Sequence, residues 1–302
     1  VYKRQGMGLY TGDITLENQS YMYVLRSNVA HGKINSIDIS DAKNATGVID
    51  IFVGDDLEKA GIKKLETNFQ AKNKDGTQMN TPKRDAIAID KVRHVGDPIA
   101  IVIAESTELA KNASEKIIFD IEELPSNTNT SKALGDDSPK IWENLQNNIC
   151  FDWDMGDEEK VNDAFSKADQ IINLDLTNNR IVPNPMEARG VVASFDPENE
   201  KYELRCSSQG VHSLRTRISE IIGIEENKLR VITTDVGGVF GMKIFNFPEY
   251  ICALFASKVV NRPVKWVAER SESFLSDTHG SCLLYTSPSP RDGLLSRMPA
   301  SG

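Results

Sequence analysis

The sequence predicts an α+β fold, and three patterns support that prediction. Residues 98–104 are almost wholly apolar, which is typical of a strand covered on both faces. Residues 107–117 repeat apolar side chains at helical spacing. Between residues 21 and 53, short segments alternate apolar and polar side chains, as half-buried strands do. Strands and helices are therefore mixed within the first half of the chain.

The other elements of the first half follow from the same periodicities. Residues 58–76 are polar and rich in Lys and Asn, so we expect an exposed helix or loop there. Residues 126–139 are rich in Ser, Asn, Thr and Asp and have almost nothing to bury, which makes them the best linker candidate. The predicted strands of this half are residues 21–26, 33–39, 47–53, 98–104 and 119–123.

The second half is predicted to hold a hairpin and three helices. The hairpin joins residues 191–195 to 201–206. The helices are expected at 157–168, at 212–222 with Gly223 as the C-cap, and from Pro248 onward. The apolar face of the first would be Val161, Ala164, Phe165 and Ala168, and that of the last Ile251, Leu254, Phe255 and Val259.

The stretch Leu229–Lys243 is the most informative, because a strand leads directly into the loop Gly237-Gly238-Val239-Phe240-Gly241. Glycines lack side chains, so successive backbone N–H groups can point at a bound oxyanion or anionic cofactor. Many strand-to-helix turns also carry two glycines for steric reasons alone. The loop is not a Walker phosphate loop, because Met242 precedes Lys243 and Ile244 follows it. A phosphate-loop nucleotide-binding protein is therefore excluded.

Composition excludes several further classes of protein. The 302 residues carry a formal net charge of −9 at pH 7, without basic clusters, which argues against nucleic acids and anionic membranes as partners. No apolar run approaches the length of a membrane span. Cys150, Cys206 and Cys252 are widely spaced and odd in number, which indicates reduced thiols in a cytoplasmic protein. No pair of them has zinc or iron–sulfur spacing.

The histidines and several isolated charges are predicted to be structural. The four histidines are not paired at metal-ligand spacing, and His212 stands out only because it shares a turn with Gln209. The histidines are His31, His94, His212 and His279. We expect structural ion pairs or loop caps at Asp13, Arg26, Asp97, Glu187 and Arg189.

Several short motifs follow one another along the chain. The upstream ones are Leu9-Tyr-Thr-Gly-Asp-Ile14, Leu25-Arg-Ser27, Ala30-His-Gly32 and Val95-Gly-Asp-Pro98. The downstream ones are Asn184-Pro-Met-Glu-Ala-Arg-Gly190, Cys206-Ser-Ser-Gln-Gly-Val-His212, the glycine loop, Arg262-Pro-Val-Lys-Trp-Val267, Glu269-Arg-Ser-Glu272 and Thr278-His-Gly280. This succession covers most of the chain. It resembles the molybdenum-binding large subunit of the xanthine dehydrogenase and aldehyde oxidase family, and within it the aerobic carbon monoxide dehydrogenase type most strongly.

The resemblance implies an architecture, a cofactor and partners. An N-terminal α/β hammerhead domain is expected at residues 6–125, a linker at 126–145 and the first part of the molybdopterin-binding domain at 146–281. The cofactor would be molybdenum–molybdopterin in its cytosine dinucleotide form. The partners would be an iron–sulfur small subunit and an FAD-binding medium subunit, which carry the iron–sulfur clusters and FAD. The assembly implied is a dimer of heterotrimers.

The resemblance also implies cofactor-binding roles for five residues. The amide of Gln209 is expected to hydrogen-bond an oxygen on molybdenum, which an amide can do without adding charge. Gly238, Val239, Phe240 and Gly241 are expected to line the cofactor, with Phe240 as a wall beside the metal. A surface position for Gln209 and an ordinary core position for Phe240 are the alternatives. No side chain of this chain is expected to ligate the metal.

The implied reaction is oxidation of an aldehyde, an N-heterocycle or carbon monoxide with water-derived oxygen, and the electrons pass to the iron–sulfur and flavin subunits. Purine hydroxylases of the family carry a Glu directly after the loop lysine, so Ile244 in that place favours a smaller or less polar substrate. The family's general-base Glu and its Arg-bearing loop lie downstream. We therefore expect the chain alone to have no catalytic residue, no metal, no turnover and exposed apolar surface around the glycine loop. A non-catalytic hammerhead-type protein that binds a partner subunit, or a structural remnant, is the alternative.

The two ends do not have the character of natural protein. Residues 1–5 and 282–287 back-translate naturally into reverse-complementary DNA, as the inverted end of a transposase-based sequencing adapter would. The alternative, a disordered tail rich in Ser, Pro and Arg, has no reason to mirror the other terminus at the codon level. We therefore interpret residues 1–5 and 282–302 as adapter-derived, and residues from about Gly6 to Ser281 as a piece of a longer natural chain.

Overall fold

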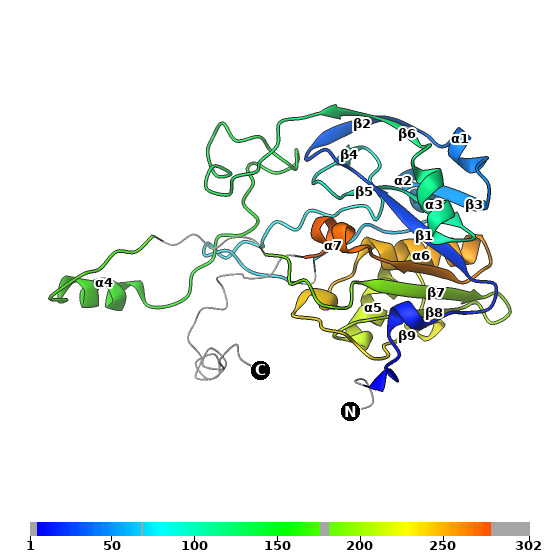
Figure 1. Cartoon of the computed structure of the whole chain (residues 1–302). Helices are drawn as coiled ribbons and strands as arrows, with labels where there is room; N and C mark the ends of the chain where they lie inside the picture. The colour runs from blue at the N-terminus through cyan, green and yellow to red at the C-terminus, as the bar shows by residue number, and fades with distance from the viewer. Residues whose placement is uncertain (1–4, 68, 176–180, 279–302) are drawn as a thin grey trace.

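A seven-stranded mixed sheet, to which both halves of the chain contribute, forms the centre of the computed structural model (Figure 1). The structure describes residues 5–67, 69–175 and 181–278. Nearly all of the predicted adapter-derived residues, and His279, lie outside this part. In spatial order the strands are β3 (Val48–Val53), β5 (Pro98–Ala104), β1 (Ser20–Arg26), β10 (Val264–Val267), β7 (Gly190–Asp196), β8 (Lys201–Cys206) and β9 (Leu229–Ile232).

Strand β10 joins the two halves of the chain within this sheet. It lies between β1 and β7, and it pairs in parallel with β1, with Ser20 opposite Val264. The backbone N–H and the hydroxyl of Ser20 both donate to the carbonyl oxygen of Pro263, at 2.8 and 2.9 Å. The predicted linker at 126–139 therefore connects two parts of one sheet, and not two separate sheets.

The predicted hairpin is confirmed as β7 and β8. The two strands pair antiparallel, from Val191 opposite Cys206 up to the turn. In the turn, the carboxylate of Asp196 accepts hydrogen bonds from the backbone N–H groups of Glu198 and Asn199, at 3.0 and 3.3 Å. An aspartate that binds the backbone two residues ahead is a common way to stabilise such a turn.

Strand β5 is buried along its whole length, as its apolar run predicts. Strands β3 and β1 flank it, both antiparallel, and helix α3 (Thr107–Ser114) packs against β5 and β1. The predicted helix at 107–117 is thus three residues too long. The helix ends at Ser114 because the chain must turn there into β6, while Ile117 remains buried.

A second, smaller sheet has the order β4 (Lys91–Val92), β2 (Gly32–Asp38), β6 (Ile118–Glu123). His31 lies just before β2 and is buried, and its Nδ1 lies 2.8 Å from the carbonyl oxygen of Pro125. This contact ties the start of β2 to the segment that follows β6. His31 therefore has the structural role that the sequence predicts.

The helices confirm the α+β class. Helices α3, α5 and α6 pack against strands of the large sheet. Gly223 ends α5 with φ of +72°, and Pro248 stands in the first turn of α6, both as predicted. The helices are α1 (Ser40–Lys43), α2 (Gly54–Lys59), α3, α4 (Glu158–Ser166), α5 (Val211–Ile222), α6 (Pro248–Val259) and α7 (Arg270–Ser276), with short 3-10 turns η2 (Thr11–Asp13), η3 (Glu226–Lys228) and η4 (Met242–Ile244).

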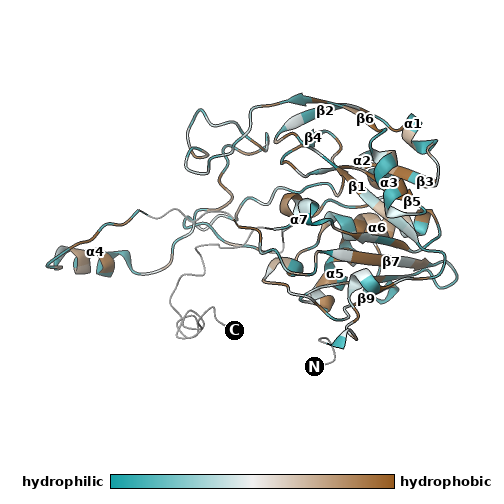
Figure 2. Cartoon of the chain, in the orientation of Figure 1, coloured by the Kyte–Doolittle hydropathy of each residue, from teal (hydrophilic) through white to brown (hydrophobic). Residues whose placement is uncertain are grey.

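Helix α6 is the centre of the core. It packs against β7, β10 and α5, and residues 250–254 are all at most 1% exposed. Of the predicted apolar face, Ile251 and Leu254 are buried and Val259 is 51% exposed. Tyr250 and Cys252, outside that face, are buried as well. Strands and another helix surround residues 248–254, so this part is buried on every side, whereas Lys258 and Val259 in the last turn are exposed. Figure 2 shows the neighbouring strand β7 as predominantly hydrophobic.

Helix α4 differs from the others, because no part of it is buried. Its predicted apolar face exists, but Val161 is 50% and Phe165 is 55% exposed. Figure 1 shows α4 at the end of an arm that projects from the body, and Figure 2 shows hydrophobic and hydrophilic residues side by side on it. The prediction of a helix is therefore confirmed, with Glu158–Ser166 in place of residues 157–168, and its apolar face is exposed. Amphipathic spacing specifies a face that can be buried, not the surface that buries it.

Candidate functional site

The glycine loop follows β9 and leads into the turn η4. Three of its residues have positive φ angles: Gly238 at +103°, Phe240 at +48° and Gly241 at +80°. A left-handed backbone at a bulky residue such as Phe240 is uncommon and has to be held by its surroundings. The loop therefore has one specific conformation, with contacts that impose it.

The first two glycines are required by a close approach of two chain segments. A Cβ added at Gly237 would lie 2.6 Å from the Cβ of Glu187. A Cβ added at Gly238 would lie 2.9 Å from Cε2 of Phe240 and 3.1 Å from the Cβ of Pro185. The loop thus packs tightly against the segment that contains the motif at residues 184–190. The steric explanation for two of the glycines holds, and it does not exclude a binding role for the exposed side of the loop.

Glu187 is the centre of this contact. Its carboxylate Oε2 accepts a hydrogen bond from the backbone N–H of Gly237 at 2.8 Å, and its own N–H donates to the carbonyl of Gly237 at 3.1 Å. The ammonium of Lys243 donates to the same Oε2 at 3.0 Å and to the carbonyl oxygen of Glu187 at 2.9 Å. The ion pair predicted for Glu187 is confirmed, with Lys243 as the partner.

Lys243 points into the protein and not toward solvent. Its side chain has no exposed surface. Burial lowers the pKa of Lys243, and the hydrogen bond and charge of Glu187 oppose that fall. A lysine held in this way is not available to bind an anion on the outer side of the loop, which is a second difference from a phosphate loop.

Gln209 lies next to the loop, between β8 and α5. Its backbone N–H donates to the carbonyl oxygen of Lys243 at 3.1 Å, and its side chain is exposed. Close by, the hydroxyl of Thr233 donates to the carbonyl oxygen of Cys206 at 2.9 Å and so ties the entry of the loop to the end of β8. The structure thus brings Gln209 and the glycine loop together, although 28 positions separate Gln209 from Gly237.

The outer side of the site is apolar and open. Phe240 is 69% exposed, so it is not an ordinary core residue in this structure. Met186, Ile244 and Phe245 are exposed as well, at 91%, 45% and 42%. The apolar surface predicted around the loop is present. The side chain of Ile244 has no group that could donate or accept a hydrogen bond at this surface.

A buried cluster of charges supports the site from behind. Arg189, two residues after Glu187, has no exposed surface and contacts Glu249 at 2.7 Å and Asp277 at 2.5 Å. Arg26 on β1 contacts Glu249 and Glu272, both at 2.6 Å. The ion pairs predicted for Arg26 and Arg189 are confirmed.

Sequence reasoning missed the three carboxylates of this cluster. A useful signal was present at one of them, because Glu249 opens a helix that is otherwise apolar and buried. A buried carboxylate needs a cation, and that requirement points to an arginine.

The other two predicted caps are confirmed: the carboxylate of Asp13 accepts from the N–H of Tyr10 at 2.9 Å, and that of Asp97 accepts from the N–H of Arg93 at 3.0 Å.

The remaining titratable candidates do not form a reactive centre. Burial raises the pKa of the Cys206 thiol to about 12, so it stays protonated near neutral pH. The three cysteines in the described part of the chain are free thiols. His212 lies exposed in the first turn of α5. Within residues 5–67, 69–175 and 181–278, no group of His, Cys, Asp and Glu could hold a metal ion, and no helix is long and apolar enough to cross a membrane.

The loop fits an anionic cofactor through its backbone. A Cβ added at Gly241 would meet no atom within 4 Å, so the space beside this residue is open. Positive φ angles at Gly238, Phe240 and Gly241 take the backbone of the loop off the extended course of a strand, so its N–H groups do not belong to a sheet. Fixed N–H dipoles of this kind can stabilise oxo and phosphate oxygens without a change of local charge.

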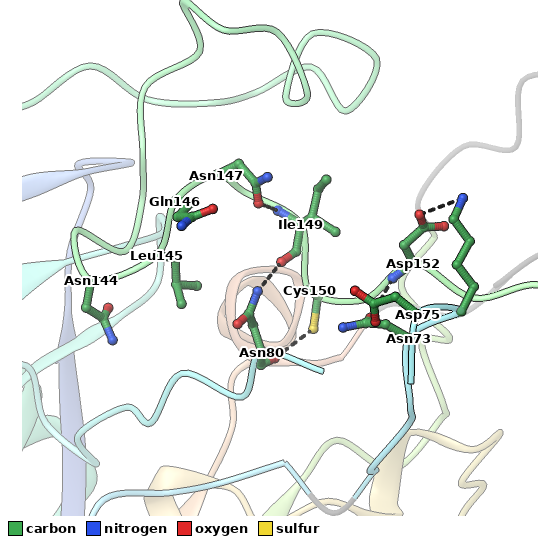
Figure 3. A pocket seen from close by; sticks show the side chains of 11 residues that line it. Asn73, Asp75, Asn80, Asn144, Leu145, Gln146, Asn147, Ile149, Cys150 and Asp152 are labelled. Atoms are coloured by element: carbon green, nitrogen blue, oxygen red, sulfur yellow. Dashed lines mark hydrogen bonds and ion pairs between the residues drawn. The ribbon is translucent and has the colours of Figure 1, made fainter. Parts of the chain in front are cut away.

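A cavity of about 510 Å³ lies elsewhere, between two surface loops (Figure 3). Amides dominate its wall, but several of them bind the protein itself. The amide nitrogen of Asn80 donates to the carbonyl of Ile149, and the amide oxygen of Asn73 accepts from the N–H of Asp152, both at 2.9 Å. No residue of the glycine loop lines this cavity. These contacts hold two chain segments together, so we do not assign the site here.

Two protein-family models match the chain. The a/b hammerhead domain of aldehyde oxidase and xanthine dehydrogenase matches residues 5–125, and the molybdopterin cofactor-binding domain matches residues 141–287. Gln209 and the glycine loop both lie within the second match.

Individual relatives agree with these matches. The chain is 33% identical to the carbon monoxide dehydrogenase large chain of Hydrogenophaga pseudoflava, over 89% of this chain and 34% of that protein. It is 32% identical to the nicotine 6-hydroxylase large subunit of Paenarthrobacter nicotinovorans, over 91% and 33%. The solved structure of reconstituted CO dehydrogenase from Oligotropha carboxidovorans superposes with a TM-score of 0.83 at 30% identity, over 92% of this chain and 35% of that one. The chain thus spans about a third of the length of these relatives.

Proposed function

We propose, from the premise that this chain belongs to the aldehyde oxidase and xanthine dehydrogenase family of molybdenum-dependent oxidoreductases, that it is part of the molybdenum-binding large subunit of a molybdenum hydroxylase. The observation that supports this most strongly is the glycine loop. Its backbone is held in a left-handed conformation beside open space, and it lies within the match to the cofactor-binding domain.

In this proposal the chain has a hammerhead domain at residues 6–125, a linker at 126–145 and the first part of the cofactor-binding domain at 146–281. Gly238, Val239, Phe240 and Gly241 line the molybdenum–molybdopterin cofactor in its cytosine dinucleotide form, mainly through backbone N–H groups. The exposed amide of Gln209 donates a hydrogen bond to the cofactor without adding charge.

The cofactor, when bound, supplies the oxidation of the substrate with oxygen from water. The residues of this chain hold it, orient it and shape the apolar side of the pocket. An iron–sulfur subunit and an FAD-binding subunit accept the electrons, in a cytoplasmic dimer of heterotrimers. The general base and the Arg-bearing loop are supplied by sequence beyond this chain.

The substrate is an aldehyde, an N-heterocycle or carbon monoxide. Ile244 and Phe245 present apolar surface at 45% and 42% exposure beside the loop, which favours a small or weakly polar substrate over a purine. Relatives of similar sequence identity are named for carbon monoxide and for nicotine, so sequence similarity alone does not narrow this range of substrates.

The test begins with the complete reading frame, recovered from the source DNA with a library prepared without a transposase adapter. The complete protein is then produced with its partner subunits in a host that makes the molybdenum cofactor. We expect stoichiometric molybdenum, release of cytidine monophosphate on acid hydrolysis, and oxidation of at least one of the three substrate classes. A complete protein that holds no molybdenum would favour the non-catalytic hammerhead-type alternative.

Variants of the glycine loop make the test specific. Gly238→Val should abolish molybdenum binding, because its side chain would collide with Phe240 and Pro185. Gly76→Ala is the matched control, since Gly76 also has a positive φ, of +85°, but lies in a remote loop with nothing within 4 Å of an added Cβ. Equal molybdenum content in the two variants would contradict the assignment of the loop. Turnover of any of these substrates by the present chain alone would contradict its assignment as an incomplete active site.

A further inference from the structure

Glu187 contacts both ends of the glycine loop. One carboxylate oxygen binds the N–H of Gly237 at the start and the ammonium of Lys243 just after the end, at 2.8 and 3.0 Å. The side chain of Glu187 is only 13% exposed and that of Lys243 is fully buried. A buried charge pair of this kind seldom adds net stability over apolar residues of the same size, because both charges lose their hydration. Its directional bonds do specify one geometry, and here that geometry is the spacing between residues 237 and 243.

The same pair reaches Gln209 through the backbone. The carbonyl oxygen of Lys243 accepts the N–H of Gln209 at 3.1 Å. The position of Lys243 therefore determines where the segment between β8 and α5 meets the loop. If the ammonium of Lys243 lost its partner, the loop and the backbone of Gln209 would no longer be held in one position.

Glu187 is itself anchored in the rigid core. Arg189, two residues along, is held by Glu249 and Asp277, and its guanidinium lies 3.8 Å from the centre of the Phe247 ring. These contacts fix the backbone next to Glu187 relative to α6. The loop is thereby attached to the most buried helix of the molecule.

We propose that Glu187 and Lys243 are positioning residues that fix the backbone of residues 237–243 and the place of Gln209, so that the loop keeps the orientation in which it receives a cofactor. The positioning itself is a property of this chain. Only its purpose rests on the proposed function. Neither side chain contacts the cofactor in the proposed site, because both are directed inward.

The experiment measures amide hydrogen exchange on the present chain, by mass spectrometry of peptides that cover residues 205–212 and 234–243. The variants are Glu187→Gln and Lys243→Met. We expect exchange at Gly237 and Gln209 to become about tenfold faster or more in both, because local opening no longer has to break the pair. Exchange in the buried strand β5 should stay unchanged, which a merely structural loss of stability would not allow.

The control is Lys111→Met, which removes a lysine whose ammonium lies 2.8 Å from Glu269, in an exposed pair away from the loop. It should leave the exchange of both peptides at the parental rate. If Lys243→Met does not fold, the exchange measured in Glu187→Gln alone tests the proposal. This variant keeps the length of the side chain and an acceptor for the N–H of Gly237. Parental exchange in the loop of Glu187→Gln, or an equal increase in β5, would overturn the inference. Absence of molybdenum from the complete protein, with fast loop exchange in the variants, would count against the proposed function alone.

Discussion

At the scale of single residues, the buried charge cluster imposes the strongest constraint. Two guanidinium groups, of Arg26 and Arg189, face three carboxyl groups, of Glu249, Glu272 and Asp277. Burial acts to raise the pKa of Glu249, but Arg189 and Arg26 outweigh it and hold that pKa well below its usual range. Burial raises the pKa of Glu272, and Arg26 offsets only part of that rise. Of the two glutamates, Glu272 is therefore the one that takes up a proton first as the pH falls.

This assignment predicts opposite pH dependences for two substitutions. The folded pKa of Glu272 is above its unfolded value of about 4.3, so the folded state holds more protons between the two values and the free energy of unfolding falls as the pH rises through them. Glu272→Gln removes this pH-dependent loss of stability. The free energy of unfolding of the variant, relative to that of the parent, should therefore rise from about pH 4 to pH 7. For Glu249 the folded pKa is depressed, so its stabilisation is fully present above the unfolded pKa of about 4.3 and is lost as the pH falls below that value. The cost of Glu249→Gln should therefore stay nearly constant from about pH 5 to pH 7 and become smaller as the pH falls toward about 3.

Urea unfolding of the parent and both variants at several pH values from about 3 to 7 measures the two trends. Glu249→Gln leaves two arginines with too few partners and should cost roughly 3–5 kcal/mol near pH 7. If that variant does not fold, the trend of Glu272→Gln remains measurable. A difference between Glu272→Gln and the parent that does not vary with pH would contradict the assignment.

The sequence predicted which residues would be charged and structural, but not their partners. Arg26 and Arg189 are 163 positions apart, and Glu249 contacts both. Nothing in local spacing indicates such a contact, because it depends on β1 and β7 lying on either side of β10. For the candidate site the motifs identified the loop and Gln209, whereas the inward direction of Lys243 required the fold.

At the scale of elements, periodicity predicted strands and helices well and burial less well. The apolar run of β5 was read correctly because a segment without polar side chains has to be covered on both faces, and the hairpin β7–β8 because its strands are near neighbours in sequence. Helix α6 and helix α4 were both assigned one apolar face. The first is buried on every side except in its last turn, and the second is not buried at all. The hydrophobic pattern alone does not show how many elements pack around a helix.

The contrast between these helices predicts very different costs for removing an apolar side chain. Phe165→Ala on α4 should change the free energy of unfolding by no more than about 0.5 kcal/mol, because the ring is 55% exposed. Leu254→Ala on α6 should cost roughly 2–5 kcal/mol, since Leu254 is fully buried and its removal leaves a cavity. Chemical denaturation followed by circular dichroism measures both. A cost above about 1 kcal/mol for Phe165→Ala would mean that the arm packs against the body in solution.

At the scale of the whole molecule, the two halves share one sheet and one charge cluster. Strand β10 connects β1 of the first half to β7 of the second, and Arg26 extends from β1 to carboxylates on α6 and α7. Without the second half, β1 would become an unpaired edge and Arg26 would lose both carboxylates. The linker is thus a covalent connection between parts that depend on each other for stability.

This dependence predicts one cooperative unfolding transition for the body of the chain. Trp266 on β10 is the buried one of three tryptophans, so with Trp142→Phe and Trp153→Phe in place its fluorescence reports the shared sheet. Far-ultraviolet circular dichroism reports all helices and strands. Within experimental error the two signals should give the same midpoint in urea, as a two-state transition requires. Residues 5–125 produced alone should unfold at a clearly lower midpoint, because β1 then lacks its parallel neighbour and its ionic contacts. Two separated transitions in the whole chain, or equal midpoints for the segment and the whole, would mean that the halves fold independently and that the sheet junction contributes little to stability.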